Sequence, residues 1–274
     1  MRGDLTSWMP QSNGDRPLLE HIDELRGRIM KVLLSIILVS TFVFVFSIRE
    51  FAFGDIIVPL PFPDLFNNIA SGIIEGIRDL VLPSYVRVIL TTPGQAILAQ
   101  FYTSMLIGII ASIPLIFLEA GAFILPGLYD EEKRIVQKLV FPATVLFILG
   151  SLLALFFVIP FTMDFLYRYG LALGAETFIT IDELISFVVF FVVAFGISFQ
   201  LPIIMWLISK VGIVDANFWK ANWRYVFVGL VIFGAAITPD GSGITMWFVS
   251  LPMMGLYVIG YLSTRSIVRK ERKN

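Results

Sequence analysis

The chain has 274 residues, of which 57% are apolar and only 15% are charged, and it combines a mean hydropathy of +0.87 with a net charge of -1. A soluble domain carries about 25% charged residues, so this composition excludes a soluble globular protein and indicates a chain that crosses a membrane several times. The absence of cysteine excludes disulfides, thiolate metal sites and cysteine nucleophiles, and a single histidine, His21, excludes a histidine-rich metal site.

The N-terminal segment, residues 1–28, is polar and is followed by no small-residue cleavage site, so we predict a cytoplasmic segment and not a cleaved signal peptide. It ends in the charged stretch "LLEHIDELRGRI" (18–29). If this stretch is helical, Glu20, Glu24, Arg28 and Lys31 lie along one stripe. From physical chemistry alone, an amphipathic interfacial helix with self-paired charges is as good an interpretation as a binding site.

Six apolar segments follow, and a bilayer core about 30 Å thick needs about 20 helical residues to cross it. We therefore predict an all-α polytopic membrane protein with a single domain, 1–274. It consists of a cytoplasmic N-terminal segment (1–28), a bundle of six transmembrane helices (29–262) and a cytoplasmic basic tail (263–274). The segment between Arg224 and Asp240 is short, about 22 Å of helix at 1.5 Å per residue, so either the membrane thins beside it or a flank is buried in protein. The six predicted spans are 29–48, 95–125, 136–163, 184–209, 223–238 and 244–262.

The distribution of basic residues predicts the topology. With six spans, 16 of the 20 lysines and arginines fall on the side of the two termini, which is therefore expected to be cytoplasmic. The other four, Arg49, Arg78, Arg87 and Arg168, fall outside. The long external loop, 49–94, contains several prolines around a possible short helix at 65–80, which favours an ordered cap. Five prolines lie within spans, where they either kink the helices or merely fit the packing: Pro114, Pro142, Pro160, Pro202 and Pro252.

Six motifs along the chain carry a family resemblance. "HIDELRGR" (21–28) resembles the HLxELRxR signature of the TatC family, the core receptor subunits of twin-arginine protein translocases. The likeness continues in order through "TTPGQAILAQF" (91–101), "AFILPGLYDEEKR" (122–134), "FGISFQLP" (195–202), "RYVFVGLVIFGAAITPD" (224–240) and "SLPMMGLY" (250–257). Pro59, Tyr129, Arg224 and Asp240 are also taken as motif positions.

The resemblance implies a function. TatC-type receptors bind the signal peptides of folded precursor proteins, which carry an arginine pair, and they recruit TatA-type, and in some systems TatB-type, single-span membrane proteins for export driven by the protonmotive force. It also implies a multi-pass protein of the cell membrane, a homo-oligomer within a larger complex, and no cofactor, metal, enzymatic step or nucleic acid.

The family places receptor carboxylates at positions that correspond here to Glu24 and Glu132, with Glu131 adjacent. Carboxylates suit two guanidinium groups because they accept charge-assisted, bidentate hydrogen bonds. Arg26 is interpreted, with Arg28, as orienting acidic neighbours, and His21 and Phe123 belong to the motifs. Without the resemblance, Glu132 would be interpreted as a loop carboxylate paired with a neighbouring lysine or arginine.

Two positions depart from the family pattern. Gln200 stands where the family has a glutamate in its fourth span, and Glu119 stands where it often has a glutamine in its second. Both lie in the cytoplasmic half at similar depth, so we predict an exchanged polar pair that shares a hydrogen bond. An acid within a bilayer indicates function by default, unless it is near enough to the interface to be hydrated.

Two other classes of protein remain to be weighed. A proton- or ion-coupled secondary transporter would also have proline-broken spans and a membrane carboxylate, but the two halves of this chain show no inverted repeat. A membrane enzyme would need a nucleophile and a base, and nothing in the sequence supports such a set.

Overall fold

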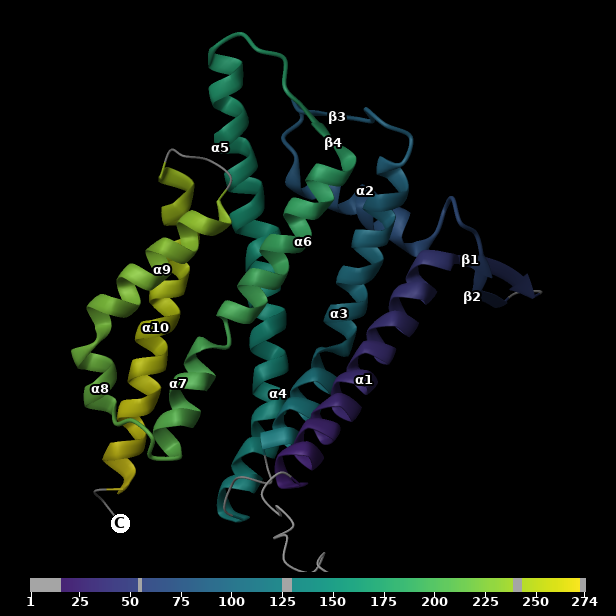
Figure 1. The fold of residues 1–274 in the computed structure, drawn as a ribbon. Coiled ribbons are helices and arrows are strands. Elements are labelled where there is room, and N and C mark those ends of the chain that lie inside the picture. Colours follow the sequence, from purple (N-terminus) through teal and green to yellow (C-terminus); the bar gives the residue numbers. More distant parts are fainter. Residues whose placement is uncertain (1–15, 54–55, 125–129, 239–242, 272–274) are drawn as a thin grey trace, which may run out of the picture.

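The computed structural model describes residues 16–53, 56–124, 130–238 and 243–271, which form a mostly helical bundle (Figure 1). In chain order its elements are α1 (Arg16–Val45), β1 (Phe46–Phe53), β2 (Ile56–Pro63), α2 (Ile69–Val81), β3 (Arg87–Ile89), α3 (Gln95–Ile124), α4 (Asp130–Leu153), a π-helix (Ala154–Val158), α5 (Ile159–Ala172), β4 (Phe178–Thr180), α6 (Ile181–Ser198), α7 (Leu201–Lys210), α8 (Ala216–Ala221), α9 (Trp223–Ile237) and α10 (Ile244–Glu271).

The membrane-crossing helices confirm the predicted fold class. Five helical stretches are long and apolar enough to span a bilayer, and they cover His21–Val45, Gln95–Phe123, Lys138–Ala172, Ile181–Lys210 and Ile244–Arg265. The sixth, α9, has 15 residues, which gives a length of about 22 Å and agrees with the predicted short fifth helix. Several boundaries differ from the prediction. The first helix, α1, begins at Arg16 and ends at Val45, so the charged stretch and the first apolar span form one continuous helix, and the third span continues through α5 to Ala172.

Only some of the intramembrane prolines interrupt a helix. Pro160 follows the π-helix that separates α4 from α5, and Pro202 lies at the start of α7, after the break that ends α6. Each proline lacks the N–H that would continue the ladder of helical hydrogen bonds. Pro114, Pro142 and Pro252 lie inside the continuous helices α3, α4 and α10, so these three do not end a helix.

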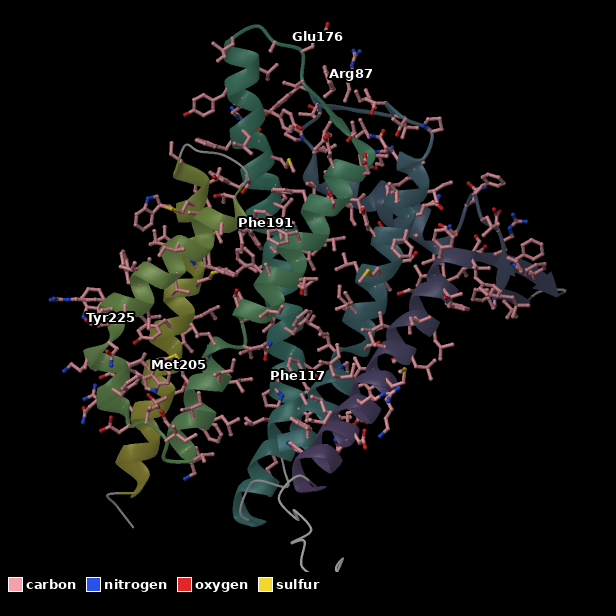
Figure 2. All side chains as sticks on the ribbon, viewed as in Figure 1. Arg87, Phe117, Glu176, Phe191, Met205 and Tyr225 are labelled. Atoms are coloured by element: carbon pink, nitrogen blue, oxygen red, sulfur yellow. The ribbon has the colours of Figure 1, made fainter. Side chains whose placement is uncertain are left out.

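The core of the bundle is centred on α6, which packs against α3 and α4. Phe191 and Phe195 on this helix are fully buried, whereas Tyr225 on α9 is 78% exposed and projects from the outside of the bundle (Figure 2). A Cβ atom on Gly196 would lie 2.6 Å from the ring of Phe147. The absence of a side chain at this position therefore lets α4 approach α6 closely.

The long loop after the first span forms defined elements wherever it is described, as predicted, and the expected short helix is α2. This helix begins at an N-cap, where the Asn68 side chain accepts a hydrogen bond from the Ser71 amide. The strands were not predicted. β1 pairs with β2 in an antiparallel hairpin, and β3 pairs with β4 in parallel, which joins this loop to the segment between α5 and α6.

Side-chain hydrogen bonds reinforce this joint between the loops. The Tyr85 hydroxyl donates to the Asp164 carboxylate at 2.8 Å, and the Thr177 hydroxyl donates to the Tyr85 carbonyl at 2.9 Å. Burial, followed by the neighbouring Asp164 carboxylate, raises the pKa of Tyr85. We call this end of the bundle, formed by α2, β3, β4 and Tyr85, the capped end.

The helices α1 and α3 lie side by side and run in opposite directions. Their seam is close, because a Cβ atom on Gly108 would clash with the Ser40 hydroxyl oxygen, and the Ser35 and Ser112 hydroxyl oxygens lie 2.9 Å apart. This register brings the charged N-terminal half of α1 beside the last turns of α3.

Candidate functional site

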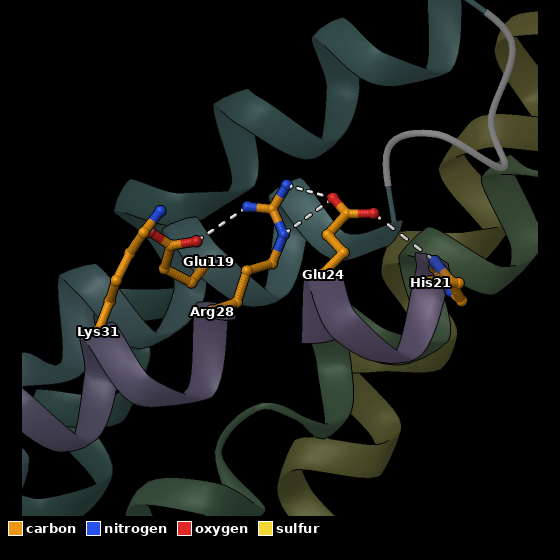
Figure 3. Close-up of polar contacts among 5 residues, drawn as sticks. All are labelled: His21, Glu24, Arg28, Lys31 and Glu119. Atoms are coloured by element: carbon orange, nitrogen blue, oxygen red, sulfur yellow. Dashed lines mark hydrogen bonds and ion pairs between the residues drawn. The ribbon is translucent and has the colours of Figure 1, made fainter. Parts of the chain in front are cut away.

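The charged stretch of α1 places four polar side chains on the side that faces α3. His21, Glu24, Arg28 and Lys31 are spaced by three, four and three residues, which keeps them on one face of a helix. Glu119 on α3 lies opposite Arg28 and Lys31 (Figure 3). We call His21, Glu24, Arg28, Lys31 and Glu119 together the charged end.

Arg28 connects the two carboxylates of the charged end. Its Nη2 atom donates to Glu24 Oε1 at 2.6 Å, its Nε atom reaches the same oxygen at 3.1 Å, and its Nη1 atom donates to Glu119 Oε2 at 2.8 Å (Figure 3). Lys31 donates to the other oxygen of Glu119 at 3.1 Å. Both oxygens of Glu119 are therefore occupied, and its side chain is only 14% exposed.

Glu24 is less completely satisfied than Glu119. Both bonds from Arg28 go to its Oε1 atom, whereas its Oε2 atom lies 3.7 Å from His21 Nδ1, which is beyond hydrogen-bond length. The side chain is 33% exposed. One oxygen of Glu24 is thus available to an incoming donor, while the other is held in position by Arg28.

The His21 ring stacks on Phe123 of α3, with ring centroids 4.3 Å apart and planes inclined by 14°. This contact and the Arg28–Glu119 pair fix α1 against α3 at two levels, one turn of α3 apart. His21 and Phe123 belong to separate sequence motifs, and the structure brings the two motifs together.

The structure describes the other predicted recognition residues only in part. Arg26 is exposed and forms no ion pair with any carboxylate that the structure describes, so only Arg28 shows the predicted orienting role. Glu131 and Glu132 lie in the first turn of α4, and their side chains are outside the described residues, as are the whole of Tyr129 and Asp240.

Two further motif residues lie away from the charged end. Pro59 is exposed on β2, in the hairpin at the other end of α1. Arg224 is exposed in the first turn of α9, with its guanidinium carbon 5.8 Å from the centre of the Trp223 ring. Neither contributes to the cluster around Arg28.

The predicted pairing of Glu119 with Gln200 is wrong. Glu119 bonds to side chains of α1, whereas the Gln200 Nε2 atom donates to the Ala143 and Gly196 carbonyl oxygens, each at 3.2 Å. Similar depth in the membrane had suggested a contact, but depth does not determine the direction in which a helix presents a side chain. Glu119 faces α1, and Gln200 faces α4.

The Gln200 side chain replaces a backbone hydrogen bond that is lost at the break between α6 and α7. Its backbone N–H bonds to the Ile197 carbonyl, which leaves the Gly196 carbonyl without its usual donor, and the Gln200 side chain supplies that donor instead. Its side chain is buried, so an unpaired carbonyl there would be costly. The residue is therefore placed to stabilise a helix interruption.

The missed partners of Glu119 had a signal in the sequence. A membrane carboxylate requires a cation or a proton donor at its own depth. Arg28 and Lys31 are the basic residues at the start of the preceding span, and an antiparallel arrangement of the two helices places them opposite Glu119.

A separate apolar pocket opens between α3, α6 and α9, with a volume of about 520 Å³. Its lining includes Ile109, Val189, Val193 and Phe233, and it contains no charged side chain. The pocket therefore suits apolar groups and offers no carboxylate to a cation.

Comparisons with known proteins agree with the motif analysis. The family model of the Sec-independent protein translocase protein TatC matches residues 20–252. The TatC protein of Cenarchaeum symbiosum is 42% identical over 92% of this chain and 96% of its own length, and that of Aquifex aeolicus is 30% identical over 94% and 98%.

Solved structures give the same result. A crystal structure of the twin-arginine translocase receptor TatC in DDM superposes with a TM-score of 0.72 at 30% identity, and it covers 89% of this chain and 99% of that chain. A second crystal structure of that receptor gives a TM-score of 0.71 at 29% identity.

Proposed function

Since the chain belongs to the TatC family of Sec-independent protein translocase proteins, we propose that it is the receptor subunit of a twin-arginine translocase. In this role it binds the arginine-pair signal peptides of folded precursors at the charged end and recruits TatA-type single-span partners. The protonmotive force drives export, and the receptor itself makes or breaks no covalent bond.

The observation that carries this proposal is the half-satisfied carboxylate of Glu24. Its Oε1 atom is held by Arg28, whereas its Oε2 atom has, among the described residues, only the long 3.7 Å ion-pair contact with His21 Nδ1. A guanidinium group is permanently charged and presents several donors in one plane, so it can bind the free oxygen without displacing Arg28. Glu119 acts through Arg28 and is a positioning residue.

A signal peptide with two adjacent arginines needs a second acceptor. Glu132, with Glu131 beside it, belongs to the first turn of α4, which follows α3 in the chain. Two carboxylates from different helices match two guanidinium groups better than one carboxylate does, because each arginine then gains its own charge-assisted partner.

The remaining features of the proposal concern location and assembly. The excess of lysine and arginine on the side of the charged end supports cytoplasmic termini in the cell membrane, since basic loops are retained on that side. A precursor made in the cytoplasm would then meet Glu24 directly. The homo-oligomeric state within a larger complex and the type of single-span partner rest on family membership.

A secondary transporter is less well supported. Such a protein binds its substrate or ion at polar groups near the middle of the membrane. Here the described pocket within the bundle is apolar, and Gln200 is occupied by two carbonyl oxygens. Within the described part of the chain, no group of three or more acidic or histidine side chains could hold a metal ion.

The test is binding of a radiolabelled twin-arginine precursor to membranes that contain wild-type or variant protein at equal levels. Glu24→Gln should weaken binding roughly tenfold or more, as expected when a charge-assisted hydrogen bond loses its charge. Glu132→Lys should abolish binding by repelling the substrate arginines, and Glu132→Gln should be milder.

Asp23→Asn is the matched control, because Asp23 is an exposed acid beside Glu24. It should bind like wild type, and a precursor with lysines in place of its arginine pair should bind poorly to every variant. Wild-type binding by both Glu24→Gln and Glu132→Lys would rule out this receptor site.

A further inference from the structure

The hairpin formed by β1 and β2 projects sideways from the bundle at the end of α1 that is remote from the charged end (Figure 1). We propose that it is a lipid anchor, embedded in the membrane interface on that side, and that lipid is its packing partner. This inference concerns a surface that signal-peptide recognition does not use, and it is independent of the proposed function.

The hairpin begins where the first span ends. The candidate span His21–Val45 has 25 residues, about 38 Å of helix, so α1 crosses a hydrocarbon core about 30 Å thick by itself. No charged residue lies between Lys31 and Arg49. Since β1 leaves the end of α1 sideways (Figure 1), the hairpin starts at the level where the hydrocarbon meets the headgroups.

Each face of the hairpin exposes apolar side chains. Directly opposed residues share a face, so Ile48 lies beside Pro61 on one face, and Phe51 lies beside Val58 on the other. Ile48 is 62% exposed, and Phe62 on the second face is 41% exposed. The face of Ile48 also carries the exposed Glu50, so the hairpin lies where this carboxylate reaches the headgroups while the apolar side chains contact lipid.

In water, the β1–β2 hairpin would leave its apolar side chains exposed and would be poorly stabilised. An isolated two-stranded hairpin is marginally stable in water, and the contacts of β1 with the helices are with α1 and α2, at the base of the hairpin. Burial of both faces among lipid removes the exposed apolar area from water and supplies the missing stabilisation.

The free edge of β2 carries three prolines. Pro59, Pro61 and Pro63 occupy alternate positions, and the ladder with β1 continues through all three. Since alternate residues direct their backbone groups to the same side, the three prolines lie where an N–H would point away from β1.

An edge with three fewer N–H groups has two consequences. It loses donors that lipid could not satisfy, which lowers the cost of placing the edge in the interface. It also cannot accept another strand along that side, which argues against a protein partner that adds to the sheet.

Arg49 and Phe62, at the base of the hairpin, indicate its depth in the membrane. Arg49 Nη2 lies 2.6 Å from Asp64 Oδ2, and its guanidinium carbon lies 4.6 Å from the centre of the Phe62 ring. Arginine with an adjacent aromatic ring is typical of the headgroup layer, where the charge reaches water and the ring contacts acyl chains. The hairpin thus lies at the boundary between hydrocarbon and headgroups.

The experiment uses single cysteines, which the native chain lacks. Ile48→Cys and Leu60→Cys place probes on opposite faces of the hairpin. Leu38→Cys on the exposed mid-part of α1 is the lipid control, and Leu173→Cys, 87% exposed after α5, is the water control. Each variant carries a fluorophore and is reconstituted in phosphatidylcholine vesicles with a large excess of lipid.

Brominated acyl chains should quench the probes at positions 48 and 60 and also that at 38, whereas aqueous iodide should quench only the probe at 173. Iodide quenching at both hairpin positions equal to that at 173 would overturn the proposal. The same measurement in nanodiscs that hold one copy of the protein tests whether a second copy, and not lipid, covers the hairpin. If iodide quenches the probes at 48 and 60 in these nanodiscs but not in vesicles, a second copy covers the hairpin, and the proposal is also overturned.

Discussion

The two ends of the bundle are held together in different ways. At the charged end, α1 and α3 are joined by long side chains, with Arg28 and Lys31 meeting Glu119. At the capped end, the loops are joined by backbone hydrogen bonds between β3 and β4 and by the hydroxyl groups of Tyr85 and Thr177.

This difference matches what each end must do. Side chains held by ion pairs can exchange one charged partner for another of the same kind, because a guanidinium group and a carboxylate each bind several partners in similar geometry. A surface of this kind can admit a guest arginine. Backbone pairing and short hydroxyl contacts have fewer alternatives, so the capped end can keep the helices aligned while the charged end rearranges.

The largest expected effect comes from removing Arg28. Arg28→Ala leaves Glu24 and Glu119 facing each other without the bridging cation, so the midpoint of thermal unfolding should fall, and transport of a twin-arginine precursor should drop to background. Lys31→Met is the control, because Lys31 is 64% exposed and bonds only to Glu119, and it should retain most transport. Equal transport by the two variants would show that Arg28 does not position Glu24.

A smaller effect is expected at Gln200, between the two ends. Gln200→Glu replaces a donor by a carboxylate that faces two carbonyl oxygens, which should cost about 1–3 kcal/mol in the free energy of unfolding. Glu119→Gln should not rescue this loss, because the residues have different partners, and the effects of independent sites should add. Recovery of thermal stability in the double variant would restore the pairing hypothesis.

At the capped end, Tyr85→Phe removes the hydroxyl that bonds to Asp164 and should cost about 1 kcal/mol. The loss should appear in thermal melts, while precursor binding at the charged end stays unchanged. The raised pKa of Tyr85 also predicts a pH dependence. The stabilisation of the fold by the Tyr85 hydroxyl is fully present below the pKa of an unfolded tyrosine, about 10. It is lost as pH rises through the higher pKa of Tyr85 in the folded protein. Tyr85→Phe should lack this alkaline loss.

The smallest effect is expected when low pH protonates Asp64 at the base of the hairpin. Hydrogen bonds from the Asn67 and Phe66 amides, followed by Arg49, lower the pKa of Asp64. Its stabilising contribution is therefore present above the unfolded pKa of about 4 and is lost as pH falls through the lower folded value. Protease cleavage of the hairpin should increase only in that range. Asp64→Asn, which keeps acceptors for the amides, should remove the pH dependence, and an unchanged profile in this variant would exclude Asp64 as its source.

The sequence by itself determined the features that depend on local composition. Runs of apolar residues specified the spans, including the short α9, because the length of an apolar helix must match the membrane. The prolines and polar residues of 49–94 indicated an ordered loop with a short helix, which is α2. The motif around Glu24 indicated the family, and the comparisons confirmed it.

Only the tertiary structure decided which side chains meet. Hydropathy gives the depth of a residue in the membrane but not the direction it faces, so Glu119 and Gln200 looked like partners although one bonds to α1 and the other repairs a break beside α4. The β1–β2 hairpin and the β3–β4 joint also escaped prediction. Strand pairing depends on residues that are distant in sequence or on a register that no single segment encodes.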